Sequence, residues 1–397
     1  MRVAIVHYWL LFYVGGEKVV HALAEMFPQA DIFAVVADDA MRARFSPHRV
    51  TTSFLQRIPG SRRYHRHFLP LYPFALEQFD LRDYDLVLSS ESGPAKGVIT
   101  SAHTCHICYC HSPMRYLWDL YHPYMDGADV RGVSRAVFAA AAHYLRLWDV
   151  ASASRVDHFV ANSRNVAARI RKHYRREAEV IYPPVDTAAG SISHPIDDYY
   201  LVVSRLVDYK RVDLAIDACR KLGRRLRIVG DGPQFATLKR RAGKGIEFLG
   251  HLRDDELRDQ YAHCRALLLP AEEDFGITSV EAQSFGRPVI AFGRGGALES
   301  VAGPFAGDEV VPGSSSGIFF GEQSRQSLCD ALIAFECAEA DFSPASIAAG
   351  AGRFSLPRFK REMQAFIARC LNSRDTVAAL PRTLDSATRR PVGVSVS

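Results

Sequence analysis

The chain has 397 residues, 48% of them hydrophobic, and a formal net charge of only +5, so it is long enough for two domains with separate cores. No run approaches about 18 uninterrupted apolar residues, so no transmembrane helix is expected. The eight cysteines are scattered along the chain, which indicates reduced thiols rather than a disulfide framework.

The first predicted element is a buried strand at Val3–Val6, which a loop containing Gly15 and Gly16 connects to a helix. Adjacent glycines are typical of a turn where backbone approaches another group closely. Residues 1–14 are apolar but lack the plan of a signal peptide, because His7 interrupts the run and no small-residue cleavage site follows. We therefore expect this segment to belong to the fold.

Residues 54–79 open with a basic stretch in which cations alternate with aromatic residues. Its arginines are Arg57, Arg62, Arg63 and Arg66. Two interpretations remain open: a solvated cationic face over a helix pair, or a surface that contacts an anionic, partly apolar partner such as a membrane. Nucleic acid fits less well, because no recognised nucleic-acid module accompanies the patch and prolines interrupt any long helix.

Two patterns in the next segment suggest metal sites, and neither is favoured. Asp83 and Asp85 precede a predicted strand at Leu86–Ser89, whereas a metal that binds a ligand needs carboxylates at the strand's carboxyl end. Cys108 and Cys110 fall on one face of a predicted strand, whereas a structural zinc site needs two ligand pairs on turns. We expect no metal.

That cysteine-containing strand ends at His111, and a proline loop with Arg115 and Tyr116 follows. The end of a parallel strand is where α/β folds place ligand contacts, so His111 is a candidate functional residue. Arg115 has two possible roles, either contacting a ligand or holding its loop by pairing with Asp119. Ser163 follows another strand, where it could cap the next helix.

The second half begins with a strand at Tyr199–Ser204, and the loop after it carries Arg205 and Lys210 before a helix at Val212–Leu222. Both cations can converge on one anion. Ser204 and, after the next strand, Gly230 lie at similar strand-to-helix turns.

A short apolar run, Arg265–Pro270, predicts a further buried parallel strand. Glu273 then lies on a strand-to-helix loop, and Glu281 projects from a helix that Gly286 ends. At the start of this helix, free amides would face the crevice and favour a diphosphate. The residues concerned are Phe275, Gly276, Ile277 and Thr278.

Together, Glu273 and Glu281, the Arg205–Lys210 element, the Gly15–Gly16 loop and the His111–Tyr116 stretch resemble retaining glycosyltransferases of family 4, which have the GT-B fold. The resemblance implies two Rossmann-like α/β domains that face a cleft. It implies that Arg205 and Lys210 stabilise a leaving diphosphate, and that Glu273 and His111 contact the donor sugar. It further implies donor contacts from the residues Gly15, Gly16, Ser204, Gly230, Phe275, Gly276, Ile277, Thr278 and Glu281, with Arg115 and Tyr116 near the acceptor.

The expected division of the chain follows from composition and from this resemblance. An acceptor-binding domain spans 1–185, a linker 186–196 and a nucleotide-sugar domain 197–355. A helix at 356–371 crosses back to the first domain, and 372–397 form a tail without periodicity, expected to be disordered.

The stretches His7–Leu10 and Tyr109–Tyr116 look most like those of bacterial mannosyltransferases of polysaccharide assembly, which implies GDP-mannose as donor and a saccharide acceptor carried on a polyprenyl diphosphate. Asp274 stands where the family usually has glycine, which puts the donor in doubt. No cofactor is expected, since the nucleotide sugar is the substrate. The expected localisation is cytoplasmic, with peripheral contact at the inner face of the membrane as a hypothesis.

Three alternatives stay open. The donor could be a UDP-sugar, the enzyme could be a GT-B sugar-nucleotide epimerase, or the chain could be a non-catalytic subunit that binds nucleotide sugars.

Overall fold

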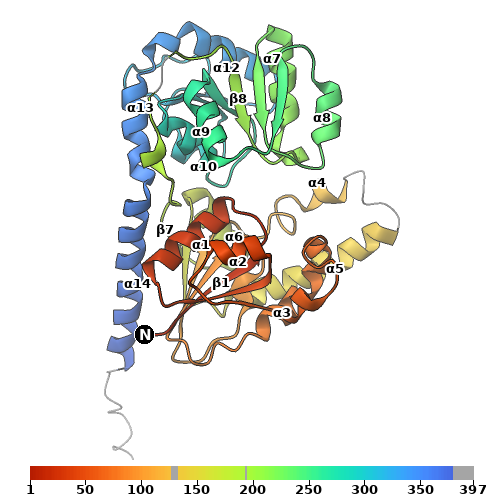
Figure 1. The fold of residues 1–397 in the computed structure, drawn as a ribbon, viewed down its shortest axis with the longest axis vertical. Helices are drawn as coiled ribbons and strands as arrows, with labels where there is room; N and C mark the ends of the chain where they lie inside the picture. The colour runs from red at the N-terminus through yellow and green to blue at the C-terminus, as the bar shows by residue number, and fades with distance from the viewer. Residues whose placement is uncertain (127–132, 193–194, 379–397) are drawn as a thin grey trace, which may run out of the picture.

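The computed structural model describes residues 1–126, 133–192 and 195–378. Two parallel β-sheets form two α/β domains, one above the other in Figure 1. The lower, N-terminal sheet has seven strands in the order β3-β2-β1-β4-β5-β6-β7. Their bounds are β1 Val3–Leu10, β2 Asp31–Ala37, β3 Val50–Thr52, β4 Leu86–Glu91, β5 Cys105–Cys110, β6 His158–Ala161 and β7 Ala178–Val180.

The upper, C-terminal sheet has six parallel strands in the order β10-β9-β8-β11-β12-β13. Their bounds are β8 Tyr200–Val203, β9 Leu226–Val229, β10 Ile246–Gly250, β11 Ala266–Leu269, β12 Val289–Phe292 and β13 Gly317–Phe320. The central strands β8, β11 and β12 are almost wholly buried, as expected for parallel strands that helices cover on both faces.

Helices connect these strands and cover the two sheets. In the N-terminal domain they are α1 Gly15–Met26, α2 Asp39–Arg44, α3 Tyr72–Glu77, α4 Tyr121–Met125, α5 Val133–Ala153 and α6 Arg164–Tyr174. In the C-terminal domain they are α7 Val212–Leu222, α8 Phe235–Arg241, α9 Asp254–His263, α10 Ile277–Ser284, α11 Ala297–Ser300, α12 Arg325–Cys337 and α13 Pro344–Ala351. The last helix is α14 Leu356–Ala378.

The order of strands creates one crevice in each domain. In the first sheet the chain moves outward from β1 and then returns to place β4 on the other side of β1. The second sheet does the same around β8 and β11. At such a switch point the connecting loops separate, and open α/β sheets bind ligands there, beyond the carboxyl ends of the strands. The ends of β1, β4, β8 and β11 are therefore where a site is expected.

The helix α14 returns to the N-terminal domain, as the vertical blue helix of Figure 1 shows. Its buried residues Phe359, Met363 and Phe366 join the core beneath α1 and β5. The expectation of a disordered tail from residue 372 is wrong for residues 372–378, which continue the helix. The helix continues there because the next helix-breaking residue, Pro381, lies further along the chain. Residues 379–397 of the expected tail lie outside the described part of the chain.

The basic stretch does not form the helix pair considered above. It forms two 3-10 segments, η1 Phe54–Arg57 and η2 His65–Leu71, before the short helix α3. Pro59 and Gly60 separate these segments, and Pro70 lies inside η2, where it removes a backbone donor. Sequence composition identified a basic stretch here, but its backbone forms 3-10 segments and turns instead of α-helices.

Candidate functional site

The loops at the two switch points carry most of the predicted site residues. In the N-terminal domain, Gly15 and Gly16 follow β1, and His111 follows β5. In the C-terminal domain, Arg205 and Lys210 follow β8, and Glu273 follows β11. In each domain the topology thus brings residues together at the carboxyl ends of the strands. Some of these residues are about a hundred positions apart in the sequence.

Lys210 and Glu273 form a direct ion pair. Lys210 Nζ lies 2.7 Å from Oε1 and 2.6 Å from Oε2 of Glu273. Although burial opposes the charge, the Glu273 carboxylate raises the pKa of Lys210, so this lysine is a fixed cation at neutral pH. Arg205 is exposed on the same loop. This loop thus presents positive charge at the end of β8.

The predicted anion site at the start of α10 has the expected backbone. Gly276 is the N-cap residue with φ +87°, in the left-handed region that favours glycine, and no side chain caps the helix. Ile277 and Thr278 are the first two residues of α10, so their amides lack intrahelical acceptors. Phe275 is buried and packs edge-on against Phe354. The structure therefore gives Phe275 a packing role beside the loop.

Glu281 is held from both domains. Its Oε2 accepts a hydrogen bond from Tyr261 at 2.9 Å, and its Oε1 lies 2.6 Å from Nζ of Lys18. Lys18 belongs to α1 of the N-terminal domain. Although burial opposes the charge, the Glu281 carboxylate raises the pKa of Lys18. This carboxylate is therefore a contact between the domains.

The glycine loop faces α10 across the same boundary. A methyl group at Gly15 would come within 2.8 Å of Cδ1 of Ile277. One at Gly16 would lie 3.7 Å from Nε2 of His111 and 3.5 Å from the Tyr8 hydroxyl. A side chain at Gly15 would therefore require the end of the Ile277 side chain in the other domain to move, whereas a methyl group at Gly16 would be in ordinary van der Waals contact with its neighbours.

His111 is a neutral hydrogen-bonding group. Its Nε2 lies 2.9 Å from Oγ of Ser90, and burial, with a further contribution from His7, lowers its pKa to about 3. The ring is therefore uncharged at neutral pH, which suits contact with a hydroxyl rather than with a phosphate.

Arg115 does not pair with Asp119, so that interpretation is wrong. Its Nη1 donates to the Glu272 carbonyl at 3.2 Å and lies 3.7 Å from Oδ1 of Asp274, both in the C-terminal domain. Asp119 instead pairs with Arg169 at 2.9 Å. Tyr116 donates its hydroxyl hydrogen to the sulfur of Met114, so it supports the loop.

Arg169 is the centre of an inter-domain cluster that the sequence did not reveal. From α6 it contacts Glu272 at 3.0 Å and also Asp274. Ser163, which caps α6 through Val166 N, donates its hydroxyl to the Asp274 carbonyl at 2.6 Å. Asp274 therefore faces the N-terminal domain, and its two arginine neighbours account for the carboxylate that stands in place of glycine.

Ser204 and Gly230 have a structural relationship. A methyl group at Gly230 would come within 2.0 Å of the Ser204 carbonyl oxygen, and Gly230 has φ +127°. Glycine is required here so that the two loops can pack. Neither residue needs a ligand to explain it.

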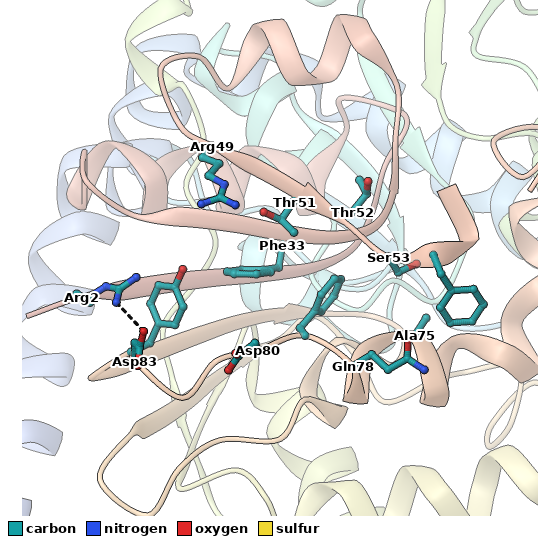
Figure 2. A pocket seen from close by; sticks show the side chains of 13 residues that line it. Arg2, Phe33, Arg49, Thr51, Thr52, Ser53, Ala75, Gln78, Asp80 and Asp83 are labelled. Atoms are coloured by element: carbon teal, nitrogen blue, oxygen red, sulfur yellow. Dashed lines mark hydrogen bonds and ion pairs between the residues drawn. The ribbon is translucent and has the colours of Figure 1, made fainter. Parts of the chain in front are cut away.

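The two metal-like patterns lie elsewhere. Asp83 and Asp85 precede β4 and pair with the Arg2 side chain and amide. Cys108 and Cys110 pack in a buried cluster on one face of β5. A hollow of about 360 Å³ lies near the amino ends of β1 and β4, with Thr51 of the edge strand β3 in its lining. Figure 2 shows the side chains that line it. It is separate from the carboxyl-end crevices.

Lys18, Arg169 and Glu299 are site residues that sequence reasoning missed. Glu299 accepts the backbone amides of Arg164 and Asn165 at 2.8 and 3.0 Å, at the start of α6. All three side chains make contacts across the domain boundary. They were missed because a single charged residue on an amphipathic helix has no local sequence pattern that indicates a partner in another domain.

Two family models cover most of the chain. Residues 13–189 match the model described as Glycosyltransferase Family 4, and residues 197–335 match the model described as Glycosyl transferases group 1. The chain carries both glycosyltransferase domains, in that order. Each matched region corresponds to one sheet with its helices.

Curated relatives match over shorter regions. An uncharacterized glycosyltransferase of Methanocaldococcus jannaschii is 29% identical over 38% of this chain and 44% of its own. The O-antigen chain mannosyltransferase C of Escherichia coli is 27% identical over 34% of this chain and 42% of its own. The match thus spans less than half the length of these relatives.

Solved structures match over nearly the whole fold. Anabaena HepE in complex with UDP-glucose has a TM-score of 0.67 at 18% identity, covering 93% of this chain and all of that chain. Sucrose-phosphate synthase from Thermosynechococcus elongatus has a TM-score of 0.65 at 14% identity, covering 94% of this chain and all of that chain. The fold is GT-B, as the sequence motifs predicted.

Proposed function

We propose that the protein is a retaining, metal-independent glycosyltransferase that moves mannose from GDP-mannose to a hydroxyl of a lipid-linked saccharide in polysaccharide assembly. The observation that carries the proposal is that the two switch-point crevices meet: Lys18 of α1 contacts Glu281 of α10 across the domain boundary, and the Lys210–Glu273 pair lies on loops of the C-terminal domain. A crevice with fixed cations and carboxylates suits a ligand that has both a diphosphate and sugar hydroxyls.

The positions of the residues support a role for each of them in this proposal. The donor diphosphate lies at the start of α10, where free amides and the helix dipole favour an anion. Lys210 and Arg205 stabilise the negative charge that develops on this leaving group. Glu273 accepts hydrogen bonds from sugar hydroxyls, Glu281 from the ribose, and the neutral His111 orients the sugar beside the acceptor.

The reaction balances without a protein base. The bond between the anomeric carbon and the diphosphate oxygen breaks, and the acceptor oxygen forms its bond to that carbon on the same face. The acceptor's proton passes to the leaving diphosphate. Arg205 and Lys210 supply the charge stabilisation that a divalent cation would otherwise provide, so the proposal needs no metal.

The choice of GDP-mannose is supported by the names of two relatives. One is the mannosyltransferase of Escherichia coli. The other is a GDP-mannose-dependent phosphatidylinositol monomannoside mannosyltransferase of Mycobacterium tuberculosis, 34% identical over 25% of this chain and 30% of its own. A UDP-sugar is the second candidate, because HepE has been solved with UDP-glucose.

The first test is thermal unfolding with GDP-, UDP-, ADP- and dTDP-sugars in the absence of metal. A ligand that binds only the folded state raises the free energy of unfolding by RT ln(1 + [L]/Kd), so a tighter ligand at equal concentration gives a larger shift. Selective stabilisation by GDP-mannose that is lost in Lys210→Ala supports the proposal, and Lys221→Ala, an exposed lysine on α7, is the matched control. Selective stabilisation by a UDP-sugar would show that the donor is a UDP-sugar and not GDP-mannose.

Turnover separates the remaining alternatives. Transfer to a saccharide with the anomeric configuration of the donor retained supports the proposal. Release of a free epimer without an acceptor would identify an epimerase. Donor binding with no turnover on any acceptor tested would identify a binding subunit.

A further inference from the structure

The backbone of the loop that carries Glu273 is held from both domains. The three successive carbonyl oxygens of residues 272–274 each accept a hydrogen bond. In chain order the donors are Nη1 of Arg115 at 3.2 Å, the Gly296 amide at 2.8 Å and Oγ of Ser163 at 2.6 Å. Arg115 and Ser163 belong to the N-terminal domain. The conformation of this loop of the C-terminal domain therefore depends on the other domain.

One guanidinium group binds the side chains on both sides of Glu273. Nη2 of Arg169 lies 3.0 Å from Oε1 of Glu272, and its Nη1 contacts Oδ1 of Asp274. The remaining nitrogen, Nε, lies 2.9 Å from Oδ2 of Asp119. Arg169 is only 9% exposed. Because each nitrogen of this planar fork has a carboxylate partner, the guanidinium is held in one orientation.

The side chain of Glu273 points to the opposite side of the loop from its two neighbours. Glu273 forms a parallel β-bridge with Gly295, and in extended backbone successive side chains point to opposite faces. Both neighbouring carboxylates are held on the side of the N-terminal domain. The Glu273 carboxylate is thereby left facing Lys210, whose Nζ lies 2.7 and 2.6 Å from its two oxygens.

We propose that Arg169 is a positioning residue, which fixes the loop so that the Glu273 carboxylate faces Lys210 and the cleft. It does so through the carboxylates of Glu272 and Asp274. A helix of the N-terminal domain thus completes a site whose ligand-binding residues belong to the C-terminal domain. The consequence for sugar transfer rests on the proposed function, in which Glu273 binds the donor sugar. The positioning itself does not.

The competing interpretation is that Arg169 only joins the two domains. Other contacts also join them. Lys18 pairs with Glu281 at 2.6 Å, and Glu299 accepts two backbone amides at the start of α6, the helix that carries Arg169. The two interpretations differ in which lysine responds when Arg169 is lost. A positioning residue affects Lys210 alone, whereas a residue that only joins the domains affects Lys18 as well.

The test is amine labelling of the full chain with acetic anhydride, without donor or acceptor, followed for each lysine by peptide mass spectrometry. Although burial opposes the charge, the Glu273 carboxylate raises the pKa of Lys210, so losing this pair increases the free amine. Glu273→Gln should therefore speed the labelling of Lys210 on the order of tenfold. Arg169→Met should speed it at least about threefold and leave the labelling of Lys18 unchanged.

The direction of the change separates positioning from a simple loss of charge. Removing the Arg169 cation without moving the loop would favour the charged form of Lys210 and slow its labelling. In the Glu273→Gln background Arg169→Met should give no further increase, because the residue through which Arg169 acts is gone. Arg169→Lys keeps the charge but lacks the planar fork, so it should also label faster than the parent. Arg171→Met, on the exposed face of the same helix, is the matched control and should label like the parent.

Unchanged or slower labelling of Lys210 in Arg169→Met, or equal increases at Lys210 and Lys18, would overturn the proposal. Steady-state transfer then measures the consequence for catalysis. Arg169→Lys should lower kcat/KM for the donor on the order of tenfold, and the same substitution should have no further effect in the Glu273→Gln background. Parental kcat/KM in Arg169→Lys would also overturn the positioning role. A parent protein that transfers no sugar would contradict the proposed function, and the labelling would still decide how Glu273 is held.

Discussion

Lys18 and Glu281 belong to different domains, yet their side chains meet at 2.6 Å, and Tyr261 binds the other oxygen of the same carboxylate. Glu281, the proposed ribose-binding residue, is thus also a contact between the two domains. A nucleotide sugar whose ribose hydroxyls donate hydrogen bonds to Glu281 has to share this carboxylate with Lys18 or displace Lys18 from it. Donor binding and the approach of the two domains are therefore linked at this carboxylate.

Glu281→Gln separates these roles. The Lys18–Glu281 pair is partly exposed, so its loss should change the free energy of unfolding by less than about 1 kcal/mol. Donor affinity should fall about tenfold, because a charge-assisted hydrogen bond to the ribose is lost. Calorimetric unfolding and donor titration measure the two effects. A large loss of stability with unchanged donor affinity would contradict the ribose assignment.

Arg169→Met should destabilise the protein by about 1–3 kcal/mol, because Asp274 and Glu272 lose their buried cation but are themselves partly exposed, and Arg115 still lies near Asp274. Although burial raises the pKa of Asp274, Arg115 and Arg169 oppose that shift. Adding Asp274→Asn should therefore recover part of the loss. Arg171→Met, on the exposed face of the same helix, is the control and should cost about 1 kcal/mol or less. Denaturant unfolding gives the comparison.

Lys210→Ala should lower kcat on the order of 10²–10³-fold, as removal of one fixed charge-stabilising group does elsewhere. Lys221→Ala should leave kcat unchanged. Steady-state transfer with saturating donor measures both. A Lys210→Ala enzyme with parental kcat would show that the leaving group does not depend on this lysine.

Gly15→Ala should impair turnover, since its methyl group would lie within 2.8 Å of Cδ1 of Ile277. Ile277→Val removes that carbon. The double variant should therefore recover about tenfold in kcat/KM relative to Gly15→Ala alone, a coupling of about 1.4 kcal/mol. If the effects of the two substitutions are additive in this mutant cycle, the two side chains are not in contact during turnover.

Glu91 should make stability depend on pH. Burial raises its pKa to about 7, with Lys96 opposing and Asp149 adding to the shift. Between its ordinary value of about 4.5 and 7 the folded state holds this proton more tightly than the unfolded state does, so the free energy of unfolding falls as pH rises. The contribution is on the order of 3 kcal/mol.

Glu91→Gln should flatten the stability profile in this window, whereas Glu322→Gln, an exposed glutamate, should leave it unchanged. Thermal or urea unfolding between pH 4.5 and 7.5 provides the measurement. If the free energy of unfolding falls with pH equally in the parent and in Glu91→Gln, the pH dependence does not come from the Glu91 carboxyl.

Much of the fold could be predicted because its signals are local. Short apolar runs such as Val289–Phe292 match the observed strands, and amphipathic spacing located α7 at Val212–Leu222. Gly286 has φ +72° after α10, as expected of a glycine that ends a helix. The structure of the basic stretch was harder to predict from the sequence. Composition gives its charge, but its prolines and glycine prevent the regular helices that a periodic pattern would reveal.

The sequence by itself determined two α/β units, the order of their strands along the chain and the chemical groups at the strand ends, because each depends on neighbours within a few residues. Only the tertiary structure decided which groups meet. Arg169 contacts Glu272 and Asp274 more than a hundred residues away, and Arg115 turns to Glu272 and not to Asp119. Such contacts depend on how two separately formed domains pack, and no local pattern records that geometry.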